Sequence, residues 1–93
     1  MVKEPLSAPE LRKLLRQILA SGEVRFTSHA LAEMAKDGVT TQDVEAVLRG
    51  GVVEPGELEK GTWRYRIRAG GVYVVVTFRA ETMAVVVTAW RTK

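Results

Sequence analysis

The sequence predicts an α+β protein in which three helices pack on one face of a twisted antiparallel sheet of three to five strands, forming a two-layer sandwich. Residues 61–90 alternate apolar and polar side chains over three successive segments separated by turn residues, which is typical of an antiparallel meander. Before them, apolar residues recur at helical spacing in three segments, each with capping residues and a following glycine. A chain of 93 residues is long enough for one core, so we expect a single domain over residues 1–93.

The first helix is predicted from residues 7–22. Ser7 and Glu10 have the spacing of a capping box, and Gly22 suits a left-handed C-terminal cap. The apolar stripe consists of Leu11, Leu14, Leu15, Ile18 and Leu19. The basic residues on its outer face, Arg12, Lys13 and Arg16, are interpreted as a solvated surface.

Residues 24–26 predict a short strand, possible at an edge of the sheet, and a second helix follows it. Thr27 or Ser28 caps this helix, which begins at His29 and ends at Gly38. Its predicted buried stripe is Leu31, Met34 and Ala35.

Residues 40–51 predict the third helix, with a cap over residues 40–43 and two terminating glycines. Its inward residues are Val44, Val47 and Leu48. Beyond it, Val52 and Val53 start a possible strand. Three glutamates follow in a polar loop, Glu54, Glu57 and Glu59, and we expect them to be solvated rather than metal ligands.

The meander has a predictable register. If Gly70 and Gly71 are the central residues of a two-residue primed turn, core-side partners are Ile67 with Val74, Tyr65 with Val76, and Trp63 with Phe78. The opposite side pairs Arg68 with Tyr73, Arg66 with Val75, and Arg64 with Thr77. A turn near Glu81 and Thr82 then pairs Phe78 with Val85, Val76 with Val87, Val74 with Ala89, Tyr73 with Trp90, and Val75 with Thr88.

The non-core side of this sheet is predicted to be cationic. Guanidinium groups recur about every 7 Å along the first strand, because a strand rises about 3.3 Å per residue. Such groups grip phosphates, and aromatic side chains beside them stack unpaired bases, which favours single-stranded RNA or DNA. The alternative is an outer face that only makes the protein soluble. Mixed charges would serve solubility, whereas the charge on this face is predicted to be almost wholly of one sign. The predicted patch contains Arg64, Arg66, Arg68, Tyr73, Thr77, Arg79, Thr88 and Trp90, with Lys60 as a further RNA-binding residue.

The composition restricts the classes of protein to which this chain can belong. The net charge is +3, which suits an anionic partner when the charge is clustered. The chain has no cysteine, which excludes disulfides and thiolate metal sites. It has neither a signal-peptide layout nor an apolar run of membrane-spanning length, so we expect a soluble cytoplasmic protein with no membrane partner. In free form a monomer or weak dimer is expected.

His29 is the only histidine and lies in the first turn of a predicted helix. A helix N-terminus lowers a histidine pKa, which suits a general base; a capping or packing histidine is the equal alternative. Glu33 could orient the ring or form an ordinary exposed pair. RNA cleavage needs a base for the 2′-hydroxyl, cations for the phosphorane and an acid for the leaving oxygen. His29, the arginines and Tyr73 could supply these groups, so no metal or other cofactor is expected.

Short matches along the chain resemble the DUF4258 family. They are Phe26-Thr27-Ser28-His29-Ala30, then Met34, Gly38-Val39, Asp43-Val44 and a helix ending at Gly50-Gly51. The family usually has arginine where this chain has Glu33 and Asp37. If those arginines bind substrate, activity is absent here or has moved to the sheet.

The order of elements is also similar to the motility quorum-sensing regulator toxins. These are mRNA interferases of the RelE-like superfamily, often encoded beside a zinc-containing antitoxin. Aligned with them, Arg64, Tyr73 and Arg91 fall at active-site positions, and only Tyr73 is unchanged. The predicted register directs Arg91 towards the helices unless the last strand frays.

The leading hypothesis is therefore a RelE-like toxin of a type II toxin–antitoxin module, a metal-independent endoribonuclease that cleaves single-stranded mRNA. The candidate catalytic residues are His29, Arg64, Tyr73, Arg79 and Arg91, and the RNA-binding residues are Lys60, Arg66, Arg68 and Trp90. A cognate antitoxin would cover the cationic face with acidic residues. The alternative is an inactive relative that binds RNA or a protein through the same face, and a third is a structural domain whose sheet face is buried in a dimer.

Overall fold

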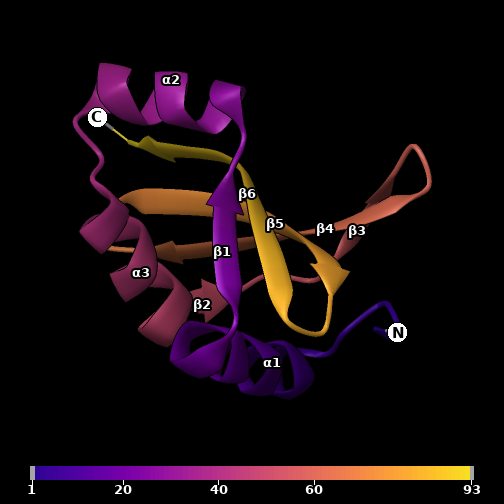
Figure 1. Ribbon diagram of the computed structural model, residues 1–93. Helices are drawn as coiled ribbons and strands as arrows, with labels where there is room; N and C mark the ends of the chain where they lie inside the picture. Colours follow the sequence, from indigo (N-terminus) through magenta and orange to yellow (C-terminus); the bar gives the residue numbers. More distant parts are fainter. Residues whose placement is uncertain (1, 93) are drawn as a thin grey trace.

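The computed structural model describes residues 2–92, which form three helices and six strands (Figure 1). The helices are α1 (Ala8–Ser21), α2 (Ser28–Asp37) and α3 (Thr41–Gly50). The strands are β1 (Glu23–Phe26), β2 (Val52–Val53), β3 (Glu57–Glu59), β4 (Thr62–Ala69), β5 (Val72–Ala80) and β6 (Met83–Arg91). The predicted α+β class is confirmed.

The sheet is larger than predicted and it is mixed. Its strand order is β1-β6-β5-β4-β2, and β3 pairs with β4 off this path, giving six strands instead of three to five. β1 runs parallel to β6, whereas the other neighbours are antiparallel. A parallel pair needs a long connection, and here α2, α3 and the other strands lie between β1 and β6 in the chain. The prediction of an antiparallel sheet of three to five strands was therefore wrong.

β1 and α2 lie one after the other along the same edge of β6. β1 pairs with β6 only as far as Val86, and the Thr27 N–H then donates to the Val86 carbonyl at 3.1 Å. At the other end of α2, the Asp37 carboxylate accepts the Arg91 N–H at 3.0 Å. The C-terminal half of β6 is thus flanked by a helix rather than a strand (Figure 1).

The helix ends follow the capping chemistry of the sequence with two exceptions. The capping box predicted at Ser7 is confirmed, and the cap predicted over residues 40–43 is a capping box of Thr40 and Asp43. Thr27 is the cap of α2, so the helix begins at Ser28 and not at His29. Gly22 has an extended backbone with φ of −106°, so the left-handed cap was wrong there. Glycine is required instead by close packing, since a Cβ at Gly22 would lie 2.5 Å from the Thr82 carbonyl oxygen.

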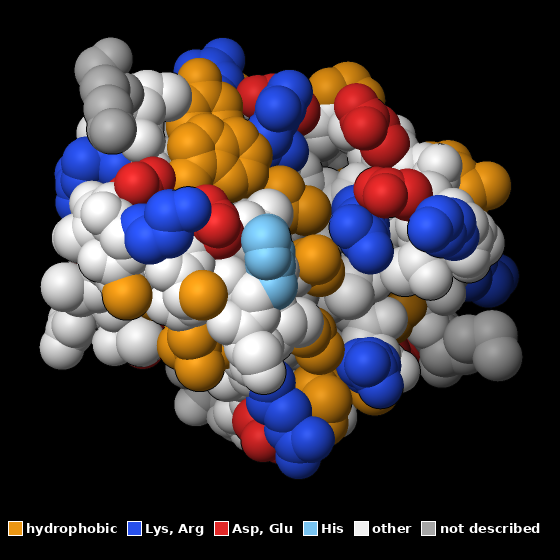
Figure 2. Space-filling view, turned by 90° about the horizontal axis from the view of Figure 1, so that it is seen from above, with side chains coloured by type: hydrophobic (Ala, Val, Ile, Leu, Met, Phe, Trp, Pro, Cys, Tyr) orange, Lys and Arg blue, Asp and Glu red, His pale blue; other side chains and the backbone are white. Residues whose placement is uncertain are grey.

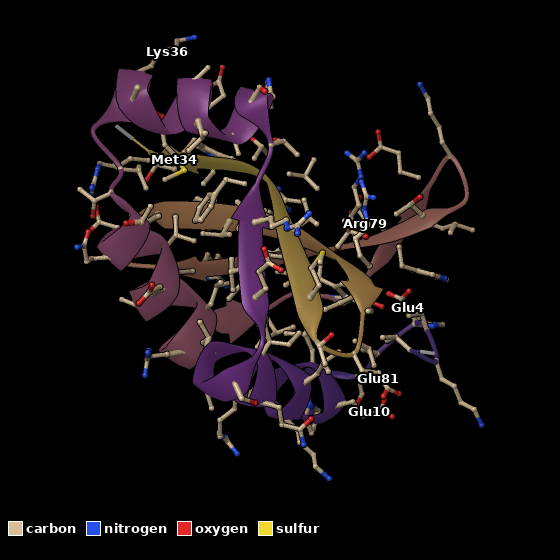
Figure 3. The ribbon with its side chains drawn as sticks, viewed as in Figure 1. Glu4, Glu10, Met34, Lys36, Arg79 and Glu81 are labelled. Carbon is tan, nitrogen blue, oxygen red and sulfur yellow. The ribbon has the colours of Figure 1, made fainter. Side chains whose placement is uncertain are left out.

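One core lies between the helices and the sheet. Met34 points from α2 towards the strands (Figure 3). Leu31 is 51% exposed and Ala35 is also exposed, so the predicted stripe of α2 was wrong for both. The reason is that α2 packs on the sheet mainly against β6, through the narrower pair Ala30 and Met34. The other helical core residues are Leu11, Leu15 and Ile18 of α1 and Val44, Val47 and Leu48 of α3.

The first hairpin of the meander has the predicted register. Gly70 and Gly71 have φ of 56° and 80°, which the primed turn requires. The confirmed pairs are Tyr65 with Val76, Arg66 with Val75, Ile67 with Val74, and Arg68 with Tyr73. The ladder ends at Tyr65–Val76, so the predicted partners Trp63–Phe78 and Arg64–Thr77 do not form, and the Thr77 hydroxyl donates to the Trp63 carbonyl oxygen at 3.0 Å instead.

The second hairpin contains two register shifts that the alternation did not predict, between Val75 and Val76 and between Phe78 and Ala80. Tyr73–Trp90, Val74–Ala89 and Val75–Thr88 are confirmed as partners. Beyond them Val76 pairs with Val86 and Phe78 with Ala84, so the predicted partners Val87 and Val85 were wrong. Val87 is the additional residue of a bulge, and its carbonyl oxygen accepts the Thr27 hydroxyl at 2.8 Å. The bulge thus coincides with the start of α2.

Candidate nucleic-acid interface

The sheet surface opposite the helices, called the outer face below, carries the predicted polar and aromatic side chains. Strand alternation explains it, because Tyr65 and Ile67 are buried in the core while Arg66 and Arg68 between and beyond them are exposed. The outer face consists of Arg64, Arg66, Arg68, Tyr73, Val75, Thr77, Thr88 and Trp90.

Two aromatic rings lie stacked on this face, near the start of β5 and the end of β6. Tyr73 and Trp90 are register partners on β5 and β6, and their ring centroids are 5.2 Å apart with planes inclined by 5°. The Arg66 guanidinium carbon lies 5.8 Å from the Tyr73 centroid, within cation–π range. Both rings are half-buried, so each keeps surface for a ligand.

The arginines of β4 are paired with glutamates, which the sequence did not predict. Arg66 donates twice to one Glu54 oxygen, at 3.0 Å from Nε and 2.8 Å from Nη2, and Arg68 Nε donates to the other at 3.2 Å. Arg64 pairs with Glu59 at 3.4 Å. The outer face is therefore of mixed charge, and the expectation of almost one sign was wrong. β2 and β3 cause this, because their pairing with β4 places the acidic segment against the arginines.

The ion pairs shift the ionisation of both partners. Hydrogen bonds from Arg66 hold the pKa of Glu54 below its usual value despite partial desolvation. The same hydrogen bonds raise the pKa of Arg66. At neutral pH the pair is fully charged, so an anionic ligand of Arg66 and Arg68 has to compete with the Glu54 carboxylate.

A hollow of about 230 Å³ lies between these groups. It is lined by Glu54, Pro55, Glu57, Glu59, Arg64, Arg66, Val75, Thr88 and Trp90. Arg64 Nε is buried beside it and has no hydrogen-bond partner among residues 2–92. A buried donor without a partner is costly, but this atom is not accessible from the hollow, so a ligand reaches it only after the Arg64 side chain moves.

The other candidate residues lie elsewhere. Lys60 has φ of 50° in the turn between β3 and β4 and is exposed. Arg79 lines a different hollow with Val2, Phe78, Ala80, Glu4, Glu81 and Thr82 (Figure 3). Arg91 points to the helix side, as its register predicted, and its guanidinium lies 3.4 Å from Asp43. The structure thus brings together Arg64, Arg66, Tyr73 and Trp90, with Arg68 next to them. Lys60, Arg79 and Arg91 lie outside this group.

His29 is an exposed residue of the first turn of α2, and Figure 2 shows it at the molecular surface. Within the described chain no hydrogen bond or ion pair holds its ring. Glu33 pairs with Lys36 at 3.5 Å, so neither predicted role beside His29, orientation of the ring or an exposed i,i+4 pair, is observed. His29 does not line the hollow of the outer face.

Sequence reasoning also missed the role of Tyr65. Its hydroxyl accepts the Leu6 N–H at 2.9 Å and donates to Glu4 at 2.9 Å, which anchors the segment before α1 to the sheet. Burial is the main cause that raises the pKa of Tyr65 to about 12. An aromatic residue with a polar tip between Trp63 and Ile67 on the core side of the strand was the available signal.

Two further structural findings concern metal binding and membrane spanning. No group of three or more histidine, cysteine, aspartate or glutamate side chains that could hold a metal ion occurs within residues 2–92. None of the helices in that range is long and apolar enough to cross a membrane.

Comparison with protein families assigns the chain to a family. Residues 26–91 match the model described as a domain of unknown function, DUF4258. Because the match covers most of the chain, the protein belongs to the DUF4258 family, as its motifs predicted. Neither a curated protein nor a solved structure matches the chain.

Proposed function

We propose that this protein binds single-stranded RNA on the outer face and cleaves it without a metal, as the RelE-like toxin of a type II toxin–antitoxin module in the cytoplasm. The observation that carries the proposal is the Tyr73–Trp90 stack beside a hollow lined by Arg64 and Arg66. The three helices lie on the other side of the sheet, so this face is free to receive a ligand.

The chemistry of the face favours single-stranded RNA over a duplex. Aromatic side chains stack on bases only where the bases are unpaired, and such stacking contributes about 1–3 kcal/mol per base. The half-buried Trp90 ring, next to the Thr88 hydroxyl, offers such a platform. Arg64 and Arg66 lie on the same hollow, where they can bind the phosphate beside a stacked base.

The proposed reaction is an internal transfer at phosphorus. The 2′-oxygen loses its proton to a base and forms a bond to phosphorus, while the bond to the 5′-oxygen breaks and that oxygen takes a proton from an acid. The products are a 2′,3′-cyclic phosphate and a 5′-hydroxyl. Arg64 and Arg66 stabilise the charge of the phosphorane, and the Tyr73 hydroxyl serves in acid–base transfer. His29 is the other candidate base, and Arg79 and Arg91 are accessory candidates.

A second candidate function is RNA or protein binding without cleavage. It is favoured by the ion pairs that Glu54 makes with both Arg66 and Arg68 and by the position of His29 outside the hollow. In that case the face would hold its ligand but lack a positioned base.

Incubation of purified protein with a long single-stranded RNA in EDTA distinguishes the two functions. Cleavage with cyclic-phosphate ends, lost in Arg66→Ala and Tyr73→Phe but retained in Arg25→Ala, is the expected result. Arg25 is the matched control, because it is an exposed arginine paired with Glu23 on the edge strand β1. Salt-sensitive binding of intact RNA would leave only the binding function. His29→Ala, run in parallel, tells whether the histidine takes part.

Expression in cells tests the proposed role as a toxin. A toxin produced without its antitoxin should arrest growth, and Arg66→Ala should relieve the arrest. Normal growth at the same protein level would contradict the toxin assignment.

A further inference from the structure

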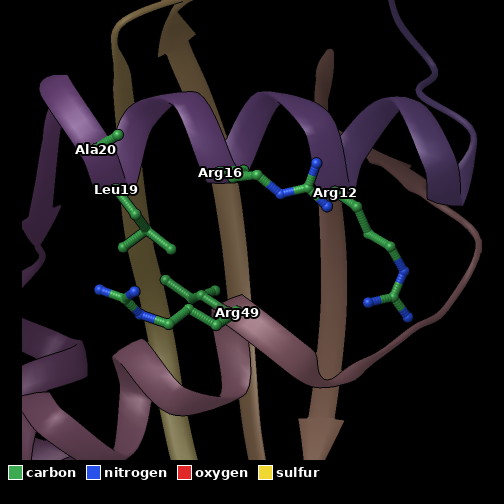
Figure 4. A pocket seen from close by; sticks show the side chains of 6 residues that line it. Arg12, Arg16, Leu19, Ala20 and Arg49 are labelled. Atoms are coloured by element: carbon green, nitrogen blue, oxygen red, sulfur yellow. The ribbon is translucent and has the colours of Figure 1, made fainter.

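A groove of about 280 Å³ lies between α1 and α3, on the helix side of the sheet (Figure 4). It is lined by Arg12, Arg16, Leu19, Ala20, Leu48 and Arg49. The sequence favoured a solvated surface for Arg12 and Arg16, because α1 seen alone does not show that a third arginine from α3 joins them.

The three arginines differ from those of the outer face in having no counter-charge. Among residues 2–92, none of Arg12, Arg16 and Arg49 forms an ion pair or a side-chain hydrogen bond, whereas Arg64, Arg66 and Arg68 each pair with a glutamate. Three like charges around one groove repel one another, and an anionic ligand removes that repulsion. The groove therefore has a stronger uncompensated positive charge than the outer face.

The arrangement of the side chains indicates the form of the ligand. In Figure 4 the Arg49 guanidinium lies near Leu19 at one end of the groove, while those of Arg16 and Arg12 lie towards the other end. The charges are thus spread along the groove and do not converge on one point. A ligand that satisfies them needs several negative groups along its length, which a single small anion lacks.

The lining of the groove favours a peptide over a nucleic acid. Besides the arginines it consists of the apolar residues Leu19, Ala20 and Leu48, and none of the lining residues is aromatic. Single-stranded nucleic acid gains its binding energy from stacking as well as from phosphate contacts, and this groove offers no ring to stack on. An amphipathic segment, by contrast, places apolar side chains against these apolar residues and carboxylates beside the arginines.

We propose that the α1–α3 groove binds an acidic amphipathic segment of a partner protein. The groove and the outer face lie on opposite sides of the sheet, so the partner segment and an RNA can be bound at the same time. This inference does not depend on ribonuclease activity. If the partner is an antitoxin, the groove anchors it without any acidic residue having to cover the cationic sheet face.

The test uses a short synthetic helical peptide with leucine on one face and glutamate flanking it, labelled for fluorescence anisotropy. Binding to the wild type is expected, with a loss of at least about tenfold in affinity for Arg16→Glu combined with Arg49→Glu. Lys13→Glu is the matched control, since it reverses an exposed charge on the same helix without lining the groove, and it should change affinity by less than about threefold. Circular dichroism and thermal unfolding verify that each variant is folded.

Any of three results would overturn the inference. The first is that the peptide fails to bind the folded wild type. The second is that Lys13→Glu weakens binding as much as Arg16→Glu combined with Arg49→Glu, and the third is that single-stranded RNA, added at saturation, displaces the peptide. Loss of RNA binding in Arg16→Glu combined with Arg49→Glu, with no peptide binding, would assign the groove to nucleic acid. Because cleavage and RNA binding are measured separately on Arg66→Ala, failure here is distinguishable from failure of the proposed function.

Discussion

The Glu54 carboxylate is the main obstacle to phosphate binding on the outer face, so Glu54→Gln should tighten RNA binding. One oxygen accepts two hydrogen bonds from Arg66 and the other accepts one from Arg68. The side chains of these arginines are 46% and 47% exposed, so solvent screens each ion pair. A ligand that takes both guanidiniums has to break both pairs. Removing the charge should therefore raise affinity about two- to thirtyfold, the range expected for the loss of two screened pairs.

The assay is anisotropy of a labelled single-stranded RNA at several salt concentrations. The slope of log affinity against log salt should steepen by about 0.7 for each arginine that gains a phosphate. Glu45→Gln is the control, because it removes the same charge from an exposed position on α3. Equal gains in the two variants would show a general effect of net charge, and weaker binding by Glu54→Gln would refute the competition argument.

Three other variants test separate parts of the structure. Tyr73→Phe keeps the ring stacked on Trp90, so RNA cleavage in a gel assay should fall about a hundredfold or more while RNA affinity stays within about threefold; unchanged cleavage removes Tyr73 from the chemistry. Tyr65→Phe should lower the free energy of unfolding by about 1–2 kcal/mol in urea. Because the pKa of Tyr65 is raised from 10.0 to about 12, its extra stability is present below pH 10 and lost as pH rises towards 12, and Tyr65→Phe should lack this alkaline loss. Thr27→Ala removes the cap of α2 and its bond to β6, at an expected cost of about 1–2 kcal/mol, with Thr41→Ala as a near-neutral control.

Local signals predicted much of the fold. The alternation around Tyr65 and Ile67 and the turn at Gly70 and Gly71 fixed the first hairpin, because a half-buried strand exposes every second residue whatever its neighbours are. Side-chain caps act within four residues, so the ends at Ser7 and Thr40 were also accessible from the sequence.

Features that depend on pairing between strands far apart in the chain could not be predicted from the sequence. Ala84–Val87 is apolar throughout, so alternation cannot show which residues face the core or that a bulge falls at Val87. The parallel pairing of β1 depends on where the chain returns after α2 and α3.

The sequence predicted the residues that the outer face brings together, but it did not predict their ion pairs or that His29, Arg79 and Arg91 lie elsewhere. Tyr73, Trp90 and the arginines meet because they share one side of neighbouring strands. The pairing of Glu54 with Arg66 requires β2 to lie against β4, where the Glu54 N–H also donates to the Arg66 carbonyl at 2.9 Å. A possible strand at Val52 and Val53 was predicted and is observed as β2, but two valines do not show which strand β2 pairs with.

The central claim is that single-stranded RNA stacks on the outer face, and the fluorescence of Trp90 tests it most directly. Trp63→Phe leaves Trp90 as the sole tryptophan, because the chain has two. Titration of this variant with a short single-stranded RNA should quench the emission saturably, and the duplex of the same sequence should have little effect. If RNA binds, as anisotropy would report, while Trp90 emission stays unchanged, the interface lies elsewhere on the protein.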